Sequence, residues 1–117
     1  MISTINKLLL SKAKQTVAAE KRYKHFIRRS HFVIAIGITK KGNIIACNAS
    51  KPAQAPKKLK QHAEGAIMLR FRNKVDTIYI ARFNRQLEPV HIEPCAVCSA
   101  LARRLNIKIK SLEVTMS

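Results

Sequence analysis

Two short motifs, about thirty residues apart, contain the residue types of a zinc site. A His-Ala-Glu motif at 62–64 is followed by a Pro-Cys-Ala-Val-Cys motif at 94–98. One imidazole and two thiolates supply three zinc ligands and leave the fourth tetrahedral position open to water; these ligands are His62, Cys95 and Cys98. Glu64 is the right kind of group to move protons to and from that water. The motifs therefore predict a catalytic Zn²⁺ ion with Glu64 as its acid–base partner.

Each motif on its own is less specific. A lone C-x-x-C is common in redox proteins, and a lone H-x-E occurs often by chance. A structural zinc needs a fourth ligand, and His91 is the nearest spare candidate, in a loop that can face solvent. His25 and His31 fall in a predicted helix and strand as packing or surface residues, and Cys47 reads as a small buried hydrophobe. The combination favours an open, catalytic site.

The elements that must hold this site follow from hydrophobic periodicity. The first thirty residues predict one amphipathic helix, with a transit peptide as the less favoured alternative. Strands are predicted at 31–38, 44–48 and 76–83, and a last one is indicated by Ile107, Ile109, Leu112 and Val114. Helices are predicted at 63–72 and 94–105, and the second begins at Pro94, whose missing N–H costs nothing in the first turn. A turn at 41–43 and polar loops at 49–61 and 84–93 connect them.

This order, α-β-β-α-β-α-β, predicts an α/β fold in three layers, α/β/α, with a mixed sheet of about four strands. Residues 1–117 form one compact domain by length. Cys95 and Cys98 lie at i and i+3 in the first turn of their helix, whose positive end favours thiolates. His62 starts the other helix, so three ligands converge if the two helix starts face each other at neighbouring strand ends.

Composition adds a second strong signal. Twenty-three Lys and Arg residues against six Asp and Glu residues give a formal net charge of +17. A cation of this size attracts polyanions by counterion release, so nucleic acid is the expected partner; solvated lysines on helix faces are the alternative. No apolar run is long enough to span a membrane. Three cysteines, two in a C-x-x-C, are typical of metal or redox chemistry in a reducing compartment, which predicts a cytoplasmic location.

The H-x-E and P-C-x-x-C motifs together resemble those of the cytidine deaminase-like superfamily of zinc-dependent nucleobase deaminases. The resemblance implies that His62, Cys95 and Cys98 hold zinc, and that Glu64 takes a proton from the attacking water, protonates the ring nitrogen and assists departure of ammonia. It also implies that the Ala63 backbone N–H binds the base carbonyl and that Asn48 contacts the sugar. The residues after Cys98 lack the Arg-Gln of many free-nucleoside deaminases, whereas the stretch at 92–95 resembles the tRNA-adenosine deaminase motif. Most relatives add a fifth strand and a further helix.

Three functions remain open at this point. The favoured one is deamination of a base, cytosine before adenine on family frequency, within single-stranded DNA or RNA. Cations flanking the site would grip phosphates, namely Lys57, Lys58, Lys60, Arg82 and Arg85. Phe83 is the one aromatic residue near the motifs that could stack on a base. The alternatives are a free nucleoside or nucleotide deaminase of salvage metabolism, and a basic nucleic-acid-binding protein with structural zinc. The resemblance also implies a homo-oligomer, because a truncated sheet leaves an edge and helix faces uncovered.

Overall fold

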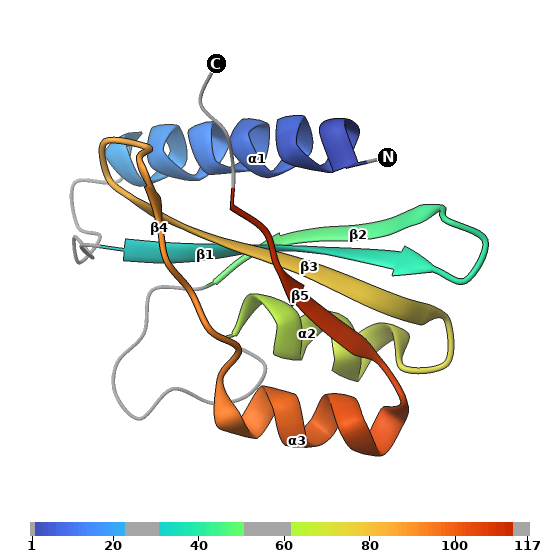
Figure 1. The fold of residues 1–117 in the computed structure, drawn as a ribbon. Helices are drawn as coiled ribbons and strands as arrows, with labels where there is room; N and C mark the ends of the chain where they lie inside the picture. The colour runs from blue at the N-terminus through green and yellow to red at the C-terminus, as the bar shows by residue number, and fades with distance from the viewer. Residues whose placement is uncertain (1, 23–30, 51–61, 114–117) are drawn as a thin grey trace.

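The predicted α/β class is confirmed by the computed structural model, which describes residues 2–22, 31–50 and 62–113 (Figure 1). Within these ranges, three helices accompany one mixed sheet of five strands. The helices are α1 (Ile2–Arg22), α2 (Ala63–Phe71) and α3 (Ala96–Leu105). The strands are β1 (His31–Thr39), β2 (Ile44–Ala49), β3 (Val75–Asn84), β4 (Pro89–Val90) and β5 (Lys108–Ser111). None of the described helices is both long and apolar enough to cross a membrane.

The sheet is organised around its two longest strands, β1 and β3. Strand β1 pairs antiparallel with β2 on one side and with β3 on the other, and β5 runs parallel to β3. Strands β2, β3 and β5 therefore run in the same direction, and their carboxyl ends lie at one edge of the fold. Helix α2 follows the carboxyl end of β2 along the chain, and α3 follows that of β3 after the short strand β4; both helices begin at that edge (Figure 1).

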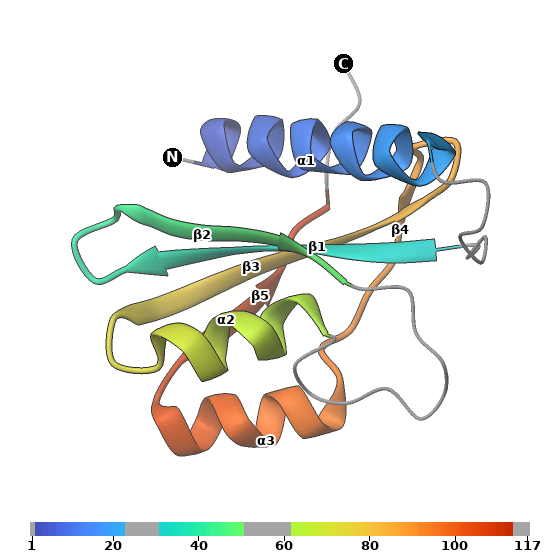
Figure 2. The same cartoon turned by 180° about the vertical axis from the view of Figure 1, so that it is seen from behind.

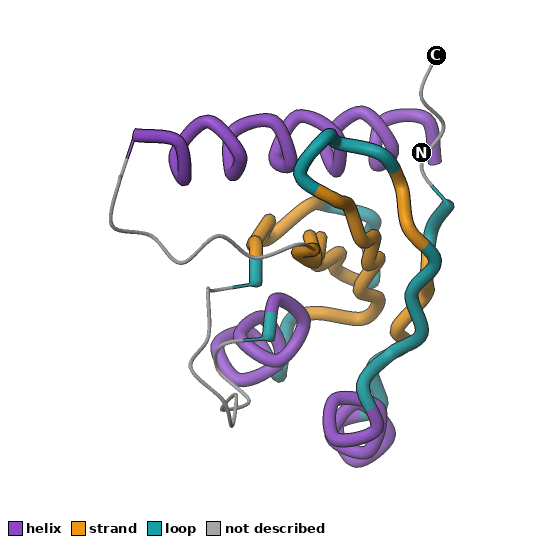
Figure 3. Tube along the Cα trace, turned by 90° about the vertical axis from the view of Figure 1, so that its left-hand side faces the viewer, coloured by secondary structure: helices purple, strands orange, loops and turns teal. Residues whose placement is uncertain are grey.

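Helix α1 covers one face of the sheet. Ile5, Leu9, Ala13 and Val17 recur every four residues and are buried, as an amphipathic helix requires. They pack against the residues of β1 and β3 that face the same way, chiefly Phe32, Ile34, Ile36, Ile38, Ala81 and Phe83. Figure 3 views this arrangement with α1 on one side of the strands and the other two helices on the opposite side. The helix predicted from the first thirty residues is confirmed over 2–22; residues 23–30 lie outside the described part.

Helices α2 and α3 cover the second face, where Ala35, Ile67, Ile78, Ile80 and Ala102 belong to a second buried cluster. Gly37 of β1 lies under α2. A Cβ atom at this position would be 2.8 Å from Cγ2 of Ile67, closer than carbon atoms pack. The missing side chain therefore lets α2 approach β1 closely, and the N-cap of α2 is His62.

The structure corrects the expectations for residues 84–95 at two points. The sheet has five strands and not about four, because the polar loop predicted at 84–93 contains β4, whose two residues pair with Arg82 and Phe83 of β3. A two-residue strand containing proline is too short to give a periodic signal. The turn before it is closed by Asn84, whose Oδ1 accepts hydrogen bonds from the backbone N–H groups of Gln86 and Glu88. Helix α3 begins at Ala96 with Cys95 as its N-cap, so Pro94 precedes the helix and is not in its first turn.

Candidate metal centre

Two helix starts present the zinc-ligand residues. His62 is the N-cap of α2 and Cys95 is the N-cap of α3, both with extended ψ angles near 139°. N-cap side chains commonly accept a hydrogen bond from the first helical turn. Neither of these side chains does so. Both are therefore available for another partner, at the edge where the carboxyl ends of β2 and β3 lie.

His62, Cys95 and Cys98 form a cluster that could hold a metal ion. One ligand atom from each residue lies within 4.8 Å of the others. Zinc with Zn–S of about 2.3 Å and Zn–N of about 2.0 Å spaces tetrahedral ligand atoms about 3.5–3.8 Å apart, so the separations between these three atoms need to shorten by at most about 1.3 Å to bind one ion. Among the described His, Cys, Asp and Glu residues, no other group of three comes together in this way.

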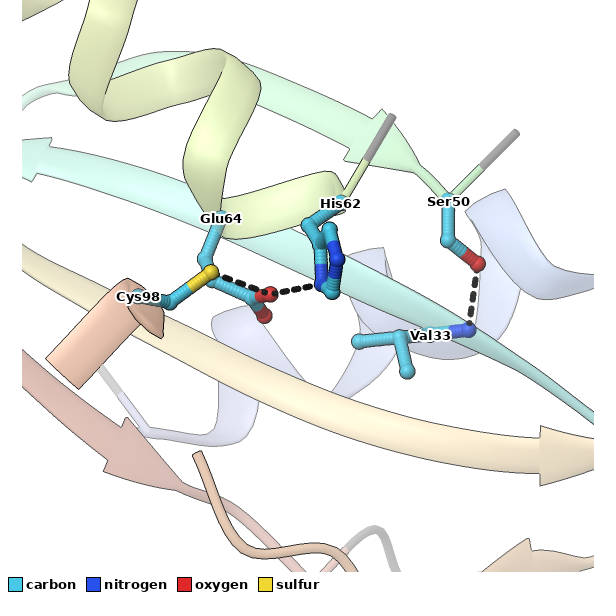
Figure 4. A network of polar contacts seen from close by, with 5 residues as sticks. All are labelled: Val33, Ser50, His62, Glu64 and Cys98. Atoms are coloured by element: carbon cyan, nitrogen blue, oxygen red, sulfur yellow. Dashed lines mark hydrogen bonds and ion pairs between the residues drawn. The ribbon is translucent and has the colours of Figure 1, made fainter. Parts of the chain in front are cut away.

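Glu64 lies against this cluster (Figure 4). Its carboxylate is almost fully buried, with 4% of the residue exposed. Sγ of Cys98 donates a hydrogen bond to Oε1 of Glu64 over 3.3 Å, and Nδ1 of His62 lies 3.6 Å from the same oxygen. Burying a carboxylate costs free energy unless polar partners compensate. Here its partners are two of the three residues that could bind metal.

The same contacts change the pKa of the Cys98 thiol. Burial raises the pKa of Cys98 above its usual value, and the negative charge of Glu64 and the hydrogen bond to it raise this pKa further. Cys95 adds a smaller effect in the same direction. A thiol with these surroundings keeps its proton at neutral pH unless a cation takes the place of that proton. The donor set thus suits a thiophilic cation such as zinc, which binds the thiolate form.

An open cavity of about 270 Å³ adjoins the cluster. His62, Glu64 and Cys95 form one part of its wall, and the remainder comes from the start of β1, Ser50, Arg82 and the segment before α3. The volume lies near the lower end of the range for small-molecule sites, about 300–1,000 Å³. A small ligand in this cavity would touch both the metal ligands and the buried carboxylate.

The two residues expected to contact substrate lie close to this region. Asn48 pairs with Ala35, so its side chain is on the sheet face that α2 and α3 cover, but it is not among the residues that line the cavity. Ala63 is the first residue of α2 and is 1% exposed. A backbone N–H in the first turn has no acceptor within its own helix, which leaves this donor for another partner.

The cations expected to bind nucleic acid divide into two sets. Arg82 lines the cavity, and Arg85 follows β3 in the turn to β4. The remaining three, Lys57, Lys58 and Lys60, lie outside the described residues.

The suggestion that Phe83 could stack on a base is wrong. Its ring is fully buried on the α1 face, with its centroid 6.0 Å from that of Phe32. It belongs to the core because alternate residues of β3 face opposite sides of the sheet. His91 also stays apart from the metal ligands: it is largely exposed, and its Nε2 lies 3.7 Å from Oε1 of Glu93.

Six of the ten residues that line the cavity were not identified as site residues from the sequence, and His31 and Ser50 are two of them. His31, interpreted there as a packing or surface residue, begins β1 and lines the cavity. Ser50 is buried; its Oγ accepts a hydrogen bond from the backbone N–H of Val33 over 3.0 Å, which ties the end of β2 to the start of β1 (Figure 4). A polar residue directly after an apolar strand was the available signal for Ser50. His31 carried none, because its place depends on β1 pairing with β3.

Comparisons of the chain with known protein families, curated proteins and solved structures give no match.

Proposed function

We propose that this protein is a zinc-dependent hydrolytic deaminase of a nucleobase, with the three-layer α/β/α fold of the cytidine deaminase-like superfamily. The observation that carries the proposal is the position of Glu64: a buried carboxylate in contact with Cys98, close to His62, and in the wall of an open cavity. A hydrolytic site needs an acid–base group beside its metal ligands, and Glu64 is a buried carboxylate beside three candidate ligands.

Zinc fits the residues that would hold it. His62, Cys95 and Cys98 offer one nitrogen and two sulfurs, the mixture found in zinc sites that keep one position open. The short distances between them and the burial of Cys98 support a site that is formed before metal binds. When bound, zinc acts as a Lewis acid that lowers the pKa of water toward about 7.

The proposed reaction replaces an amino group of the base by the oxygen of water. Glu64 accepts one proton of the attacking water and delivers it to the ring nitrogen, and the amino group then leaves as ammonia after receiving a second proton through the same carboxylate. The products are a carbonyl-containing base and ammonia, so atoms and charge balance. The Ala63 N–H, in the first turn of α2, would donate to the carbonyl of the base. The cavity walls would hold the ring against these two groups.

The polynucleotide form of the substrate is favoured by the charge of the chain, +17. The cations at 57, 58 and 60 directly precede the zinc histidine along the sequence. Reversing their charge should weaken binding of single-stranded DNA or RNA and flatten its salt dependence. An unchanged salt dependence would assign the binding to another face.

A free nucleotide is the second candidate substrate. It is favoured by two basic residues in the cavity wall, His31 and Arg82, which could pair with the phosphate of a single nucleotide. Both candidates use the same metal ligands and the same carboxylate, so only substrate length separates them.

The test is ammonia or product release by zinc-loaded protein. Cytidine and deoxycytidine nucleotides are compared with single-stranded oligonucleotides, and adenine-containing substrates of both kinds serve as the matched set. Turnover of the oligonucleotides alone supports the polynucleotide deaminase. Turnover of free nucleotides alone supports the second candidate. No turnover of any substrate by protein that holds one zinc per chain would contradict the proposed function.

A further inference from the structure

A second basic surface lies at the end of the fold opposite the metal centre. It is made by three connections: the β1–β2 turn, the α2–β3 turn and the α3–β5 turn. Figures 1 and 2 show all three at the same end of the molecule, away from the starts of α2 and α3. We call this the amino-edge surface, and its principal cations are Lys40, Lys41, Arg72, Lys74, Arg103 and Arg104, all of them exposed.

Strand pairing fixes these connections next to one another. The last residue of β1, Thr39, pairs with Val75 at the start of β3, and Thr77 pairs with Lys108 at the start of β5. Neighbouring strands are about 4.8 Å apart, so the end of β1 and the starts of β3 and β5 lie within about 10 Å of one another across the sheet. Cations that are up to sixty-four positions apart in the sequence, from Lys40 to Arg104, therefore lie at one end of the fold.

The acidic residues lie outside these three connections. The connecting segments 39–44, 70–75 and 103–108 contain no Asp or Glu. The nearest acid is Asp76, which is half-buried and accepts a hydrogen bond from Oγ1 of Thr77. Glu64, Glu88 and Glu93 all lie toward the metal centre, in α2, in the turn after β3 and in the cavity wall. Among the described residues, the amino-edge surface thus has six exposed cations and one adjacent acid, Asp76.

We propose that the amino-edge surface binds the phosphate backbone of a nucleic acid. Arginine offers planar, paired donors to phosphate oxygens, and two of the three connections carry it. The exposed amides of Asn43, Asn73 and Asn106, one in each connection, add donors of the kind that contact phosphate and sugar. A membrane surface fits less well, because it also requires buried apolar area. Ile44 is the one large apolar side chain exposed in these three segments.

The surface is too far from the cavity to belong to it. From Val75 at this end of β3 to Arg82 in the cavity wall is seven residues, or about 23 Å at about 3.3 Å per residue. A nucleic-acid strand with stacked bases advances about 3.4 Å per phosphate, so about seven nucleotides separate the two sites. A nucleic acid shorter than this can occupy one site only.

The experiment measures binding of a labelled single strand of about 25 nucleotides by fluorescence anisotropy, from about 50 to 200 mM salt. Replacing Arg103 and Arg104 by Gln removes two charges from this surface. Replacing Lys7 and Lys14 by Gln removes two exposed charges from α1, on the other face of the sheet. Replacing the two arginines should lower the slope of log affinity against log salt concentration by about 1.4, and should lower the affinity at 0.1 M salt by about 25-fold. Replacing the two lysines should change neither the slope nor the affinity.

A second pair of substitutions distinguishes lost phosphate contacts from a loss of stability. Arg103 and Arg104 lie in the last turn of α3, where cations also stabilise the helix end. Replacing Arg72 and Lys74 by Gln tests the same surface from another element and should give a similar fall in slope. Unchanged slopes in both pairs, or an equal fall in the α1 control, would overturn the proposal. Loss of binding to phosphatidylserine vesicles without loss of oligonucleotide binding would overturn it in favour of a membrane. The readout needs no catalysis, so it stands or falls separately from the deaminase proposal.

Discussion

Glu64 allows the sharpest test of the site, because it contacts a metal ligand without being one. Replacing it by Gln removes the charge and the capacity to carry a proton, but leaves an oxygen that can still accept the hydrogen bond from Cys98. The expected result is a protein that still binds one zinc per chain and has lost turnover. Acid–base catalysis by a placed side chain contributes about 10²- to 10⁴-fold, so kcat should fall by that factor. This corresponds to about 3–5 kcal/mol in the activation free energy.

The assay combines three measurements on each variant: zinc content, thermal unfolding and single-substrate kinetics. Unfolding should change little, because one hydrogen bond contributes about 0.5–1.5 kcal/mol and the Gln retains an acceptor. Glu113→Gln makes the same chemical change at an exposed position beyond β5 and should leave all three measurements unchanged. A Glu64→Gln variant that holds zinc and turns over within about threefold of the parent would refute the proton-transfer role. A variant that loses zinc would show instead that Glu64 builds the metal site.

Further predictions concern the cysteines and the packing of α2. Cys98→Ser should lose zinc and stability together, because metal binding couples to folding, and a chelator should lower the Tm of the parent but not of the variant. Cys47→Ser is the control and should keep one zinc per chain. Equal zinc loss in both variants would contradict the ligand assignment. In metal-free protein at pH 7, iodoacetamide should label Cys95 first, because burial raises the pKa of Cys47 and Cys98 and leaves little thiolate there. Zinc should slow labelling of Cys95 and not of Cys47, and mass spectrometry distinguishes the sites. Gly37→Ala should lower the free energy of unfolding by about 1–3 kcal/mol, because the new Cβ meets Cγ2 of Ile67 at 2.8 Å. Ile67→Ala deletes that atom, so additive effects in the double variant, measured by denaturant unfolding, would exclude this contact as the cause.

The elements that carry strong local signals were predictable. Residues 31–38 are almost continuously apolar and form β1, and the turn expected at 41–43 is present, with Gly42 at a φ of 87°. The apolar residues of α1 recur at helical spacing and are the ones that are buried. The paired motifs placed His62 and Cys95 at helix starts, where the structure has them as N-caps. All of these depend on residues close together in the chain, so sequence alone contains the information.

Other features depend on pairing across the sheet. Strand β4 forms by pairing with Arg82 and Phe83 of β3, and its two residues are too few to show a periodicity of their own. Phe83 is buried and Arg82 lines the cavity although they are neighbours, because adjacent strand residues face opposite sides. His31 reaches the cavity because β1 runs antiparallel to β3 and begins beside its carboxyl end. None of these positions could be predicted from the spacing of residues in the sequence.

The sequence by itself determined the chemistry available to this protein: one imidazole, two thiols and a carboxylate in two motifs, on a strongly cationic chain of α/β type. Tertiary structure decided how that chemistry is arranged. The parallel direction of β2, β3 and β5 brings both helix starts to one edge and the basic connections to the other. Local propensity fixes which residues form a helix or strand, but only strand pairing and the packing of helices on each face determine which distant residues meet.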